Sequence, residues 1–109
     1  MGAFATKTEL IDTNNVGAVT GKLNVRALSK ITLDVAGVTG THATHRVALQ
    51  VSVNGDDWRA AEDSAGNPIR IAGDTMLQNI EVSAAVVRAR VSTAEGAVST
   101  CNVTIQAKE

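Results

Sequence analysis

Two histidines and one cysteine carry the most distinctive chemistry in this chain. His42 and His45 stand three positions apart, and Cys101 is the one cysteine of the sequence. On a helix, two imidazoles at this spacing could bind a metal, but the pair follows Gly37 and Gly40 and precedes an alternating stretch, which predicts a loop. A metal site needs three or four ligands, and no cysteine or carboxylate cluster adjoins the pair in sequence. We therefore expect a solvated loop, with no metal and no cofactor.

The other candidate catalytic groups also favour a structural interpretation. Cys101 is in phase with Val103 and Ile105, which predicts a small buried side chain. A nucleophilic thiolate would need a base and a lowered pKa; the two histidines could serve, but the sequence does not position them. Glycosidase carboxylates must face each other across a cleft, whereas the acidic residues here are scattered. The acidic pairs at 56–57 and 62–63 lack the alternating oxygen ligands of a calcium loop. We expect no catalytic residue and no enzyme activity.

Composition excludes several classes of partner. The 10 Lys and Arg balance 11 Asp and Glu, so no basic field favours nucleic acid. Aromatic residues are only Phe4 and Trp58, too few for a stacking platform that binds sugars or single strands. No segment approaches the roughly 20 apolar residues of a membrane span, and the N-terminus has no signal-peptide pattern. A single cysteine leaves no disulfide framework, which favours folding in a reducing cytosol or stabilisation by association.

Two polar or aromatic surface features are candidates for binding. Arg88 and Arg90 share one face of a predicted strand, where they could hold carboxylates of a partner or lie solvated beside cross-strand neighbours. Trp58 follows a predicted turn and could cover one sheet or anchor an interface.

The elements that must position these residues are strands. Val47, Leu49, Val51 and Val53 alternate with smaller or polar residues, the period of a strand with one buried face. The dipeptide at 54–55, Asn-Gly, then predicts a tight hairpin turn, with a return strand from residue 56.

The C-terminal third repeats the pattern. Alternation over 87–91 and over 101–107, separated by a break at 94–96, predicts a second hairpin. Shorter strands are predicted at 8–11, 23–25, 31–35 and 69–71. Residues 76–82 fit a short helix or a strand, and alternation at 80–83 favours the strand.

This count predicts an all-β fold. Seven or eight short antiparallel strands, at roughly ten-residue spacing, indicate a β-sandwich, and we favour a jelly roll. Residues 20–109 form the predicted sandwich domain, and residues 1–19 form either an N-terminal arm or its first strand. The inward positions are Val, Ile, Leu and Ala, so the core should be thin.

Two stretches together carry a resemblance. Residues 51–58 read V-S-V-N-G-D-D-W, and residues 86–96 contain V-R-A-R-V before the tail V-T-I-Q-A-K at 103–108. This pairing resembles galactose-binding-like jelly rolls, although the aromatic loops of the sugar-binding relatives are missing. Over residues 47–108 the chain is similar to small β-sandwich proteins of tailed bacteriophages, most of all to head decoration, or cement, proteins.

The resemblance implies a structural role on a virion. Such proteins lie on the capsid exterior, often as trimers, and clamp neighbouring coat subunits. We therefore expect a homotrimer that is made in the cytoplasm of the bacterial host and binds the major capsid protein, with neither nucleic acid nor membrane as partner. The alternative is a carbohydrate-binding or adhesion module of a tail or fibre. The expected interface residues are Phe4, Leu10, Ile11, Trp58, Arg88 and Arg90.

Overall fold

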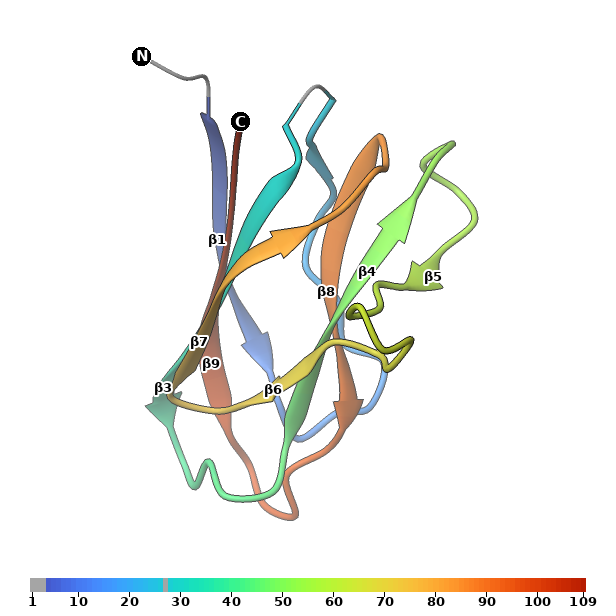
Figure 1. Cartoon of the computed structure of the whole chain (residues 1–109). Coiled ribbons are helices and arrows are strands. Elements are labelled where there is room, and N and C mark those ends of the chain that lie inside the picture. Colours follow the sequence, from blue (N-terminus) through green and yellow to red (C-terminus); the bar gives the residue numbers. More distant parts are fainter. Residues whose placement is uncertain (1–3, 27) are drawn as a thin grey trace.

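The computed structural model describes residues 4–26 and 28–109, and in this part of the chain nine strands form two antiparallel sheets (Figure 1). The strands are β1 (Phe4–Asp12), β2 (Leu23–Asn24), β3 (Lys30–Thr39), β4 (Arg46–Ser52), β5 (Arg59–Ala60), β6 (Arg70–Ala72), β7 (Thr75–Glu81), β8 (Val86–Thr93) and β9 (Thr100–Lys108). The predicted all-β sandwich is confirmed, and it contains no helix among the described residues that is long and apolar enough to cross a membrane.

The strand order is that of a jelly roll. One sheet runs β1-β9-β3-β7, and the other runs β2-β8-β4-β5, with β6 as an additional partner of β4. Without β6, the first and last strands lie side by side in one sheet, and the chain passes between the layers at every step except from β4 to β5, as two interlocked Greek keys require. Figure 1 shows the two layers with β6 crossing at their lower end.

The core lies between the layers and is built from alternate residues. Val, Ile, Leu and Ala dominate it, and the largest apolar side chains that are fully buried are Ile31, Leu33, Leu49 and Ile105. No described aromatic ring belongs to this buried set, so the core is thin, as the composition predicted.

The first predicted hairpin forms, with a longer turn than expected. β4 and β5 pair through only Gln50–Ala60 and Val51–Arg59, so the return strand begins at residue 59 rather than 56. Gly55 has the positive φ (85°) that the turn requires. The side-chain oxygen of Asn54 accepts the N–H groups of residues 56 and 57, both at 2.9 Å, and this holds the wider turn together.

The second predicted hairpin is wrong. β8 and β9 belong to different sheets: β8 pairs with β4 and β2, while β9 pairs with β1 and β3. Their apolar faces meet across the core instead of lying in one ladder. Alternation identifies a buried face, but it does not identify the sheet to which the strand belongs.

A bulge in β7 explains why the sequence of residues 76–82 fitted both a strand and a short helix. Ile80 lies opposite Ile31 and Leu77 lies opposite Leu33, so two residues of β7 oppose one of β3. Asn79, within this bulge, has a positive φ of 58°. The bulge turns Leu77 and Ile80 to the same side although they are three positions apart, which is a helical spacing.

Within the predicted N-terminal segment, Phe4–Asp12 form the strand β1. β1 pairs with β9 along its whole length, from Phe4 opposite Lys108 to Asp12 opposite Thr100. Residues 1–3 of the predicted 1–19 segment lie outside the described residues.

Candidate functional site

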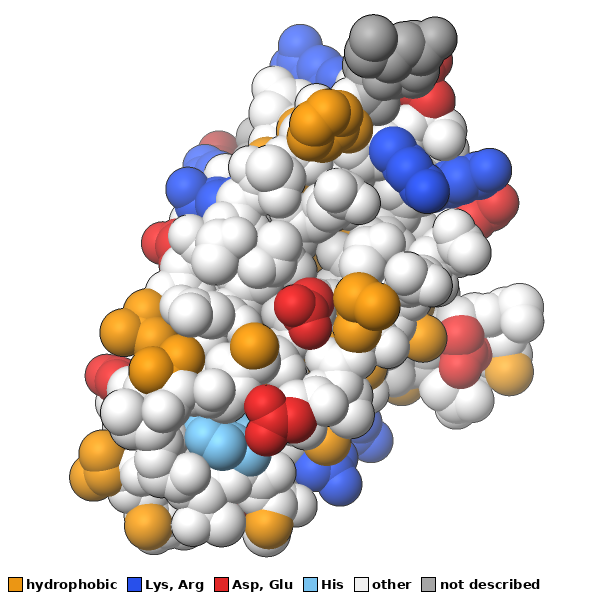
Figure 2. Space-filling model, turned by 90° about the vertical axis from the view of Figure 1, so that its left-hand side faces the viewer, with side chains coloured by type: hydrophobic (Ala, Val, Ile, Leu, Met, Phe, Trp, Pro, Cys, Tyr) orange, Lys and Arg blue, Asp and Glu red, His pale blue; other side chains and the backbone are white. Residues whose placement is uncertain are grey.

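The outer face of the four-stranded sheet is a candidate contact surface. Its central positions carry mainly uncharged polar side chains, among them Thr8, Thr32, Thr104 and Gln106, and the carboxylate of Asp34 lies among them. The hydroxyls of Thr8 and Thr104 lie 2.8 Å apart, as a cross-strand hydrogen bond. In the face shown in Figure 2, white side chains and backbone predominate between scattered charged groups. Such a surface is less costly to desolvate than one rich in Lys and Glu.

Exposed apolar side chains border this polar centre. Phe4 and Leu10 point outward from β1 and are 64% and 59% exposed, and Met76 on β7 is 54% exposed. Ile11, the third expected contact on this strand, does not reach the surface: it points inward and is 7% exposed, as part of the core. Successive side chains of a strand point to opposite sides, so Ile11 faces the core while its neighbour Leu10 faces outward.

The opposite face holds the other expected contact residues. Arg88 lies over the ring of Trp58, 4.2 Å from the ring centroid, and its Nε donates to Oε1 of Gln50 at 2.7 Å. Arg90 lies on the same face of β8, since Val87, Ala89 and Val91 point into the core. Burial lowers the pKa of Arg88. The six expected contacts therefore divide into two on one face, three on the opposite face and one in the core.

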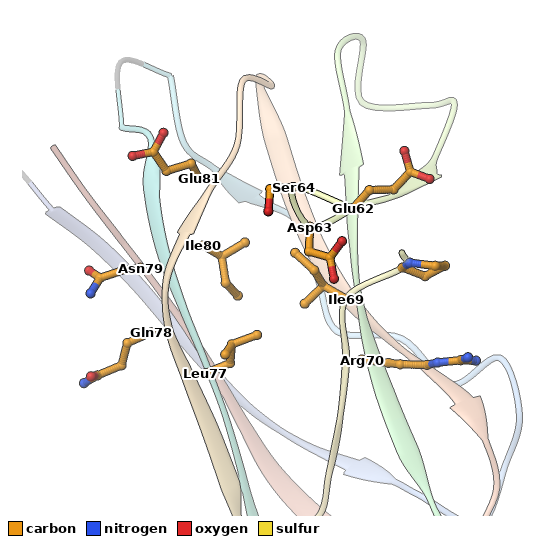
Figure 3. A pocket seen from close by; sticks show the side chains of 11 residues that line it. Glu62, Asp63, Ser64, Ile69, Arg70, Leu77, Gln78, Asn79, Ile80 and Glu81 are labelled. Carbon is orange, nitrogen blue, oxygen red and sulfur yellow. The ribbon is translucent and has the colours of Figure 1, made fainter. Parts of the chain in front are cut away.

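An open groove lies between β7 of one sheet and the segment 62–70 of the other. Its volume is about 690 Å³. Figure 3 shows Leu77 and Ile80 pointing across the groove toward Ile69, while Gln78 and Asn79 point away from it. Glu62, Asp63, Arg70 and Glu81 contribute charged groups at its margins. The groove is an apolar slot with a mainly acidic rim.

The fold brings His42, His45 and Cys101 together. The Sγ atom of Cys101 lies 3.4 Å from Nδ1 of His42 and 3.6 Å from Nε2 of His45. Ligand atoms of the three residues all lie within 4.8 Å of one another. Cys101 and His45 are fully buried, and His42 is half-buried and reaches the surface. Histidine is visible at the lower end of the face in Figure 2.

Burial favours the uncharged forms of His45 and Cys101. Desolvation lowers the pKa of His45, with the nearby carboxylate of Glu95 acting in the opposite direction. Desolvation raises the pKa of the Cys101 thiol, so the free thiol is not a ready nucleophile.

Glu95 braces the loop that carries the two histidines. Its carboxylate accepts the N–H groups of Thr44 and His45 at 3.0 and 3.1 Å and the hydroxyl of Thr44 at 2.9 Å. These donors hold the pKa of Glu95 below its usual range. The predicted loop forms, but the expectation that it is solvated is wrong, because His45 is fully buried and His42 is half-buried.

The sequence did not reveal the cluster because its parts come from different elements. The histidines lie between β3 and β4, whereas Cys101 lies on β9. The one sequence signal was the in-phase position of Cys101 beside Val103 and Ile105, which correctly predicted burial.

Comparison with known proteins identifies a similar fold. No protein-family model matches the chain, and no curated protein matches its sequence. Among solved structures, the chain is similar to the "SPBc2 prophage-derived protein YomS", with a TM-score of 0.62 at 6% sequence identity. The match covers 96% of each chain. At this identity the likeness shows a shared fold from end to end.

Proposed function

We propose that this protein is a structural protein of a tailed bacteriophage that decorates the capsid and stabilises it by bridging coat subunits. The observation that carries the proposal is the end-to-end likeness in fold to a prophage-derived protein. The sequence resemblance to head decoration proteins supplies the more specific assignment. In this role the chain is not an enzyme.

The distribution of surface residues supports a bridging role. Phe4 and Leu10 lie on the outer face of one sheet, whereas Trp58, Arg88 and Arg90 lie on the outer face of the other. A protein with contact residues on opposite faces can hold two neighbours at once. Buried area on both faces would then add to the cohesion of the shell.

The proposed assembly is a homotrimer on the capsid exterior, assembled from chains made in the bacterial cytoplasm. A thin core supports this, because association would bury further apolar surface. Major capsid protein is the proposed partner.

The test is binding to the heads of the phage or prophage that encodes the chain. Purified protein is mixed with expanded heads, unexpanded heads and isolated tails, and bound protein is measured after sedimentation. We expect saturable binding to expanded heads and greater resistance of those heads to heat. Binding to tails alone would contradict the capsid role, and light scattering coupled to size exclusion would measure the proposed trimer.

Variants on the two faces make the test specific. Leu10→Glu places a charge on the outer face of β1, and Trp58→Ala removes the ring from the opposite face. Val53→Glu is the matched control, because Val53 is 78% exposed but lies in the turn after β4. We expect both face variants, but not the control, to reduce binding. Equal binding by all three would contradict the two-face arrangement.

The groove favours the second candidate function, an adhesion or carbohydrate-binding module of a tail or fibre. Carboxylates at its rim could accept hydrogen bonds from sugar hydroxyls. Glycan-array binding that is lost in Asp63→Ala, combined with binding to tails, would support this alternative over the capsid role.

A further inference from the structure

We propose that His42, His45 and Cys101 form a binding site for one Zn²⁺ ion in each chain. The inference rests on this cluster alone and does not depend on the phage assignment. Two imidazoles and one thiolate suit a borderline-soft divalent metal such as zinc, and three protein ligands leave a fourth position for water.

The distances around the sulfur fit zinc coordination. With Zn–S of about 2.3 Å, Zn–N of about 2.0–2.1 Å and tetrahedral angles, the sulfur and each nitrogen are about 3.5 Å apart. The two observed separations are 3.4 and 3.6 Å. In the same tetrahedral geometry the two ligand nitrogens are about 3.4 Å apart. The ligand atoms of the cluster lie within 4.8 Å of one another, so metal binding would bring the two imidazole nitrogens closer together.

Two glycines leave the space that the imidazole rings occupy. Gly37 lies directly opposite Cys101 in the β3–β9 ladder, and a Cβ on Gly37 would overlap the ring of His42. A Cβ on Gly73 would overlap the ring of His45 in the same way. Glycine at both positions allows the rings to reach the sulfur.

Hydrogen bonding alone does not account for a histidine at position 45. The side chain is fully buried, yet its Nδ1 has no hydrogen-bond partner within the described residues. This Nδ1 is not the atom that faces the sulfur: Nε2 lies 3.6 Å from Sγ and is the nitrogen that would bind the metal. The thiol of Cys101 has one proton and cannot donate to both imidazoles at the same time.

The protonation states define the binding step. A neutral imidazole offers one ring nitrogen with a lone pair to a metal. The ligand form of Cys101 is the thiolate, so the protonated thiol must lose its proton on binding. Zinc therefore forms a bond to sulfur as the S–H bond breaks, and the proton leaves to solvent. No change of oxidation state is involved.

The location predicts a structural effect of the metal. The ion would join the loop between β3 and β4 to β9, at the end of the sandwich where the chain passes from one sheet to the other. A metal that binds the folded chain in preference to the unfolded chain raises Tm with metal concentration.

The experiment uses Co²⁺ as a spectroscopic probe on the full chain, stripped of metal and kept reduced with a phosphine. We expect one Co²⁺ per chain, tetrahedral d–d bands in the visible and a thiolate-to-cobalt charge-transfer band in the near ultraviolet. Stoichiometric Zn²⁺ should remove these bands. Cobalt binding without a charge-transfer band, or no saturable binding, would overturn the proposal.

Variants separate the cluster from incidental binding. Cys101→Ala should abolish the charge-transfer band, and His42→Ala should weaken affinity by at least about a hundred-fold. His42→Ala also serves if loss of the buried thiol impairs folding, because His42 is only half-buried. Thr41→Ala is the matched control, with an exposed side chain in the same loop. Unchanged cobalt spectra in folded His42→Ala, or a Zn²⁺-dependent rise in Tm that survives in this variant, would overturn the site.

Discussion

The carboxylate of Glu95 accepts the backbone N–H of His45 across 3.1 Å, and this bond ties the β8–β9 connection to the β3–β4 loop. The same carboxylate accepts two further bonds from Thr44. Three donors around one carboxylate act as a local substitute for strand pairing at an end of the sandwich where the chain changes sheets.

We predict that Glu95→Ala lowers the stability of the fold more than Glu95→Gln. The alanine variant leaves the N–H groups of Thr44 and His45 without their acceptor, whereas glutamine retains one acceptor oxygen without the charge. In urea unfolding we expect wild type to be the most stable, followed by Glu95→Gln and then Glu95→Ala. Equal stability of Glu95→Gln and Glu95→Ala would contradict the prediction, because a neutral acceptor oxygen at this position would then contribute nothing to stability.

A second prediction concerns Gly73. A methyl group there would overlap the imidazole of His45, so Gly73→Ala should cost about 1–3 kcal/mol of folding free energy. Gly96→Ala is the matched control, because nothing lies within 4 Å of a Cβ at that position. The control should be neutral or stabilise by about 0.4–1 kcal/mol through the unfolded state. If both variants unfold at the same urea concentration, the close approach around His45 is not a constraint.

The sequence predicted the strands better than their partners, and β8 and β9 illustrate the reason. Alternation gave nearly correct bounds for both, since one face of each is buried. It contained no information on which sheet each strand joins, and a six-residue connection is long enough to cross between layers. The contact residues show the same limit: Leu10 and Ile11 are adjacent in sequence but point to opposite sides of β1.

The His–Cys cluster was beyond sequence reasoning for a related reason. Its assembly depends on the register that places Gly37 opposite Cys101, and on the return of the chain that brings Gly73 beside His45. Both are consequences of sheet topology rather than of local sequence pattern.

A third prediction compares two glycines with the same backbone conformation. Gly40 and Gly66 have φ of 81° and 83°, but a Cβ at Gly40 would overlap the carbonyl oxygen of Val98, whereas nothing lies within 4 Å at Gly66. Gly66→Ala should cost about 1–2 kcal/mol from the left-handed conformation alone. Gly40→Ala should cost about 1–3 kcal/mol more from the clash. Thermal unfolding of the two variants measures the difference, and equal Tm values would contradict it.

A fourth prediction concerns the contact between Arg88 and Trp58. The guanidinium lies 4.2 Å from the ring centroid on the outer face of the five-stranded sheet. A double-mutant cycle with Arg88→Ala and Trp58→Ala should give a coupling of about 0.5–1 kcal/mol, the range for a cation–π pair at an exposed site. The same cycle with Arg90→Ala provides the control and should give coupling near zero. Similar coupling in both cycles would indicate a general charge effect instead of stacking.

The last prediction is a pH dependence from Asp63. Its Oδ1 accepts the N–H groups of Asn67 and Ala65 at 3.0 and 2.9 Å, and these bonds, with that of Asn67 contributing most, lower the pKa of the carboxyl. A carboxyl whose pKa is lower in the folded state binds fewer protons than its unfolded counterpart. Stability from this group is therefore present above the ordinary carboxyl pKa and is lost as the pH falls through the lower, folded value.

Asp63→Asn should remove this contribution, so the stability difference from wild type should be largest near neutral pH and should narrow in acid. Glu62→Gln is the control, because the bonds to the 65–67 turn are accepted by Asp63 and not by its neighbour. Urea unfolding at a series of pH values measures the difference, and NMR titration of the Asp63 carboxyl measures its pKa directly. A stability difference that stays constant from neutral to acid pH would contradict this account, since only a group with unequal folded and unfolded pKa values makes stability depend on pH.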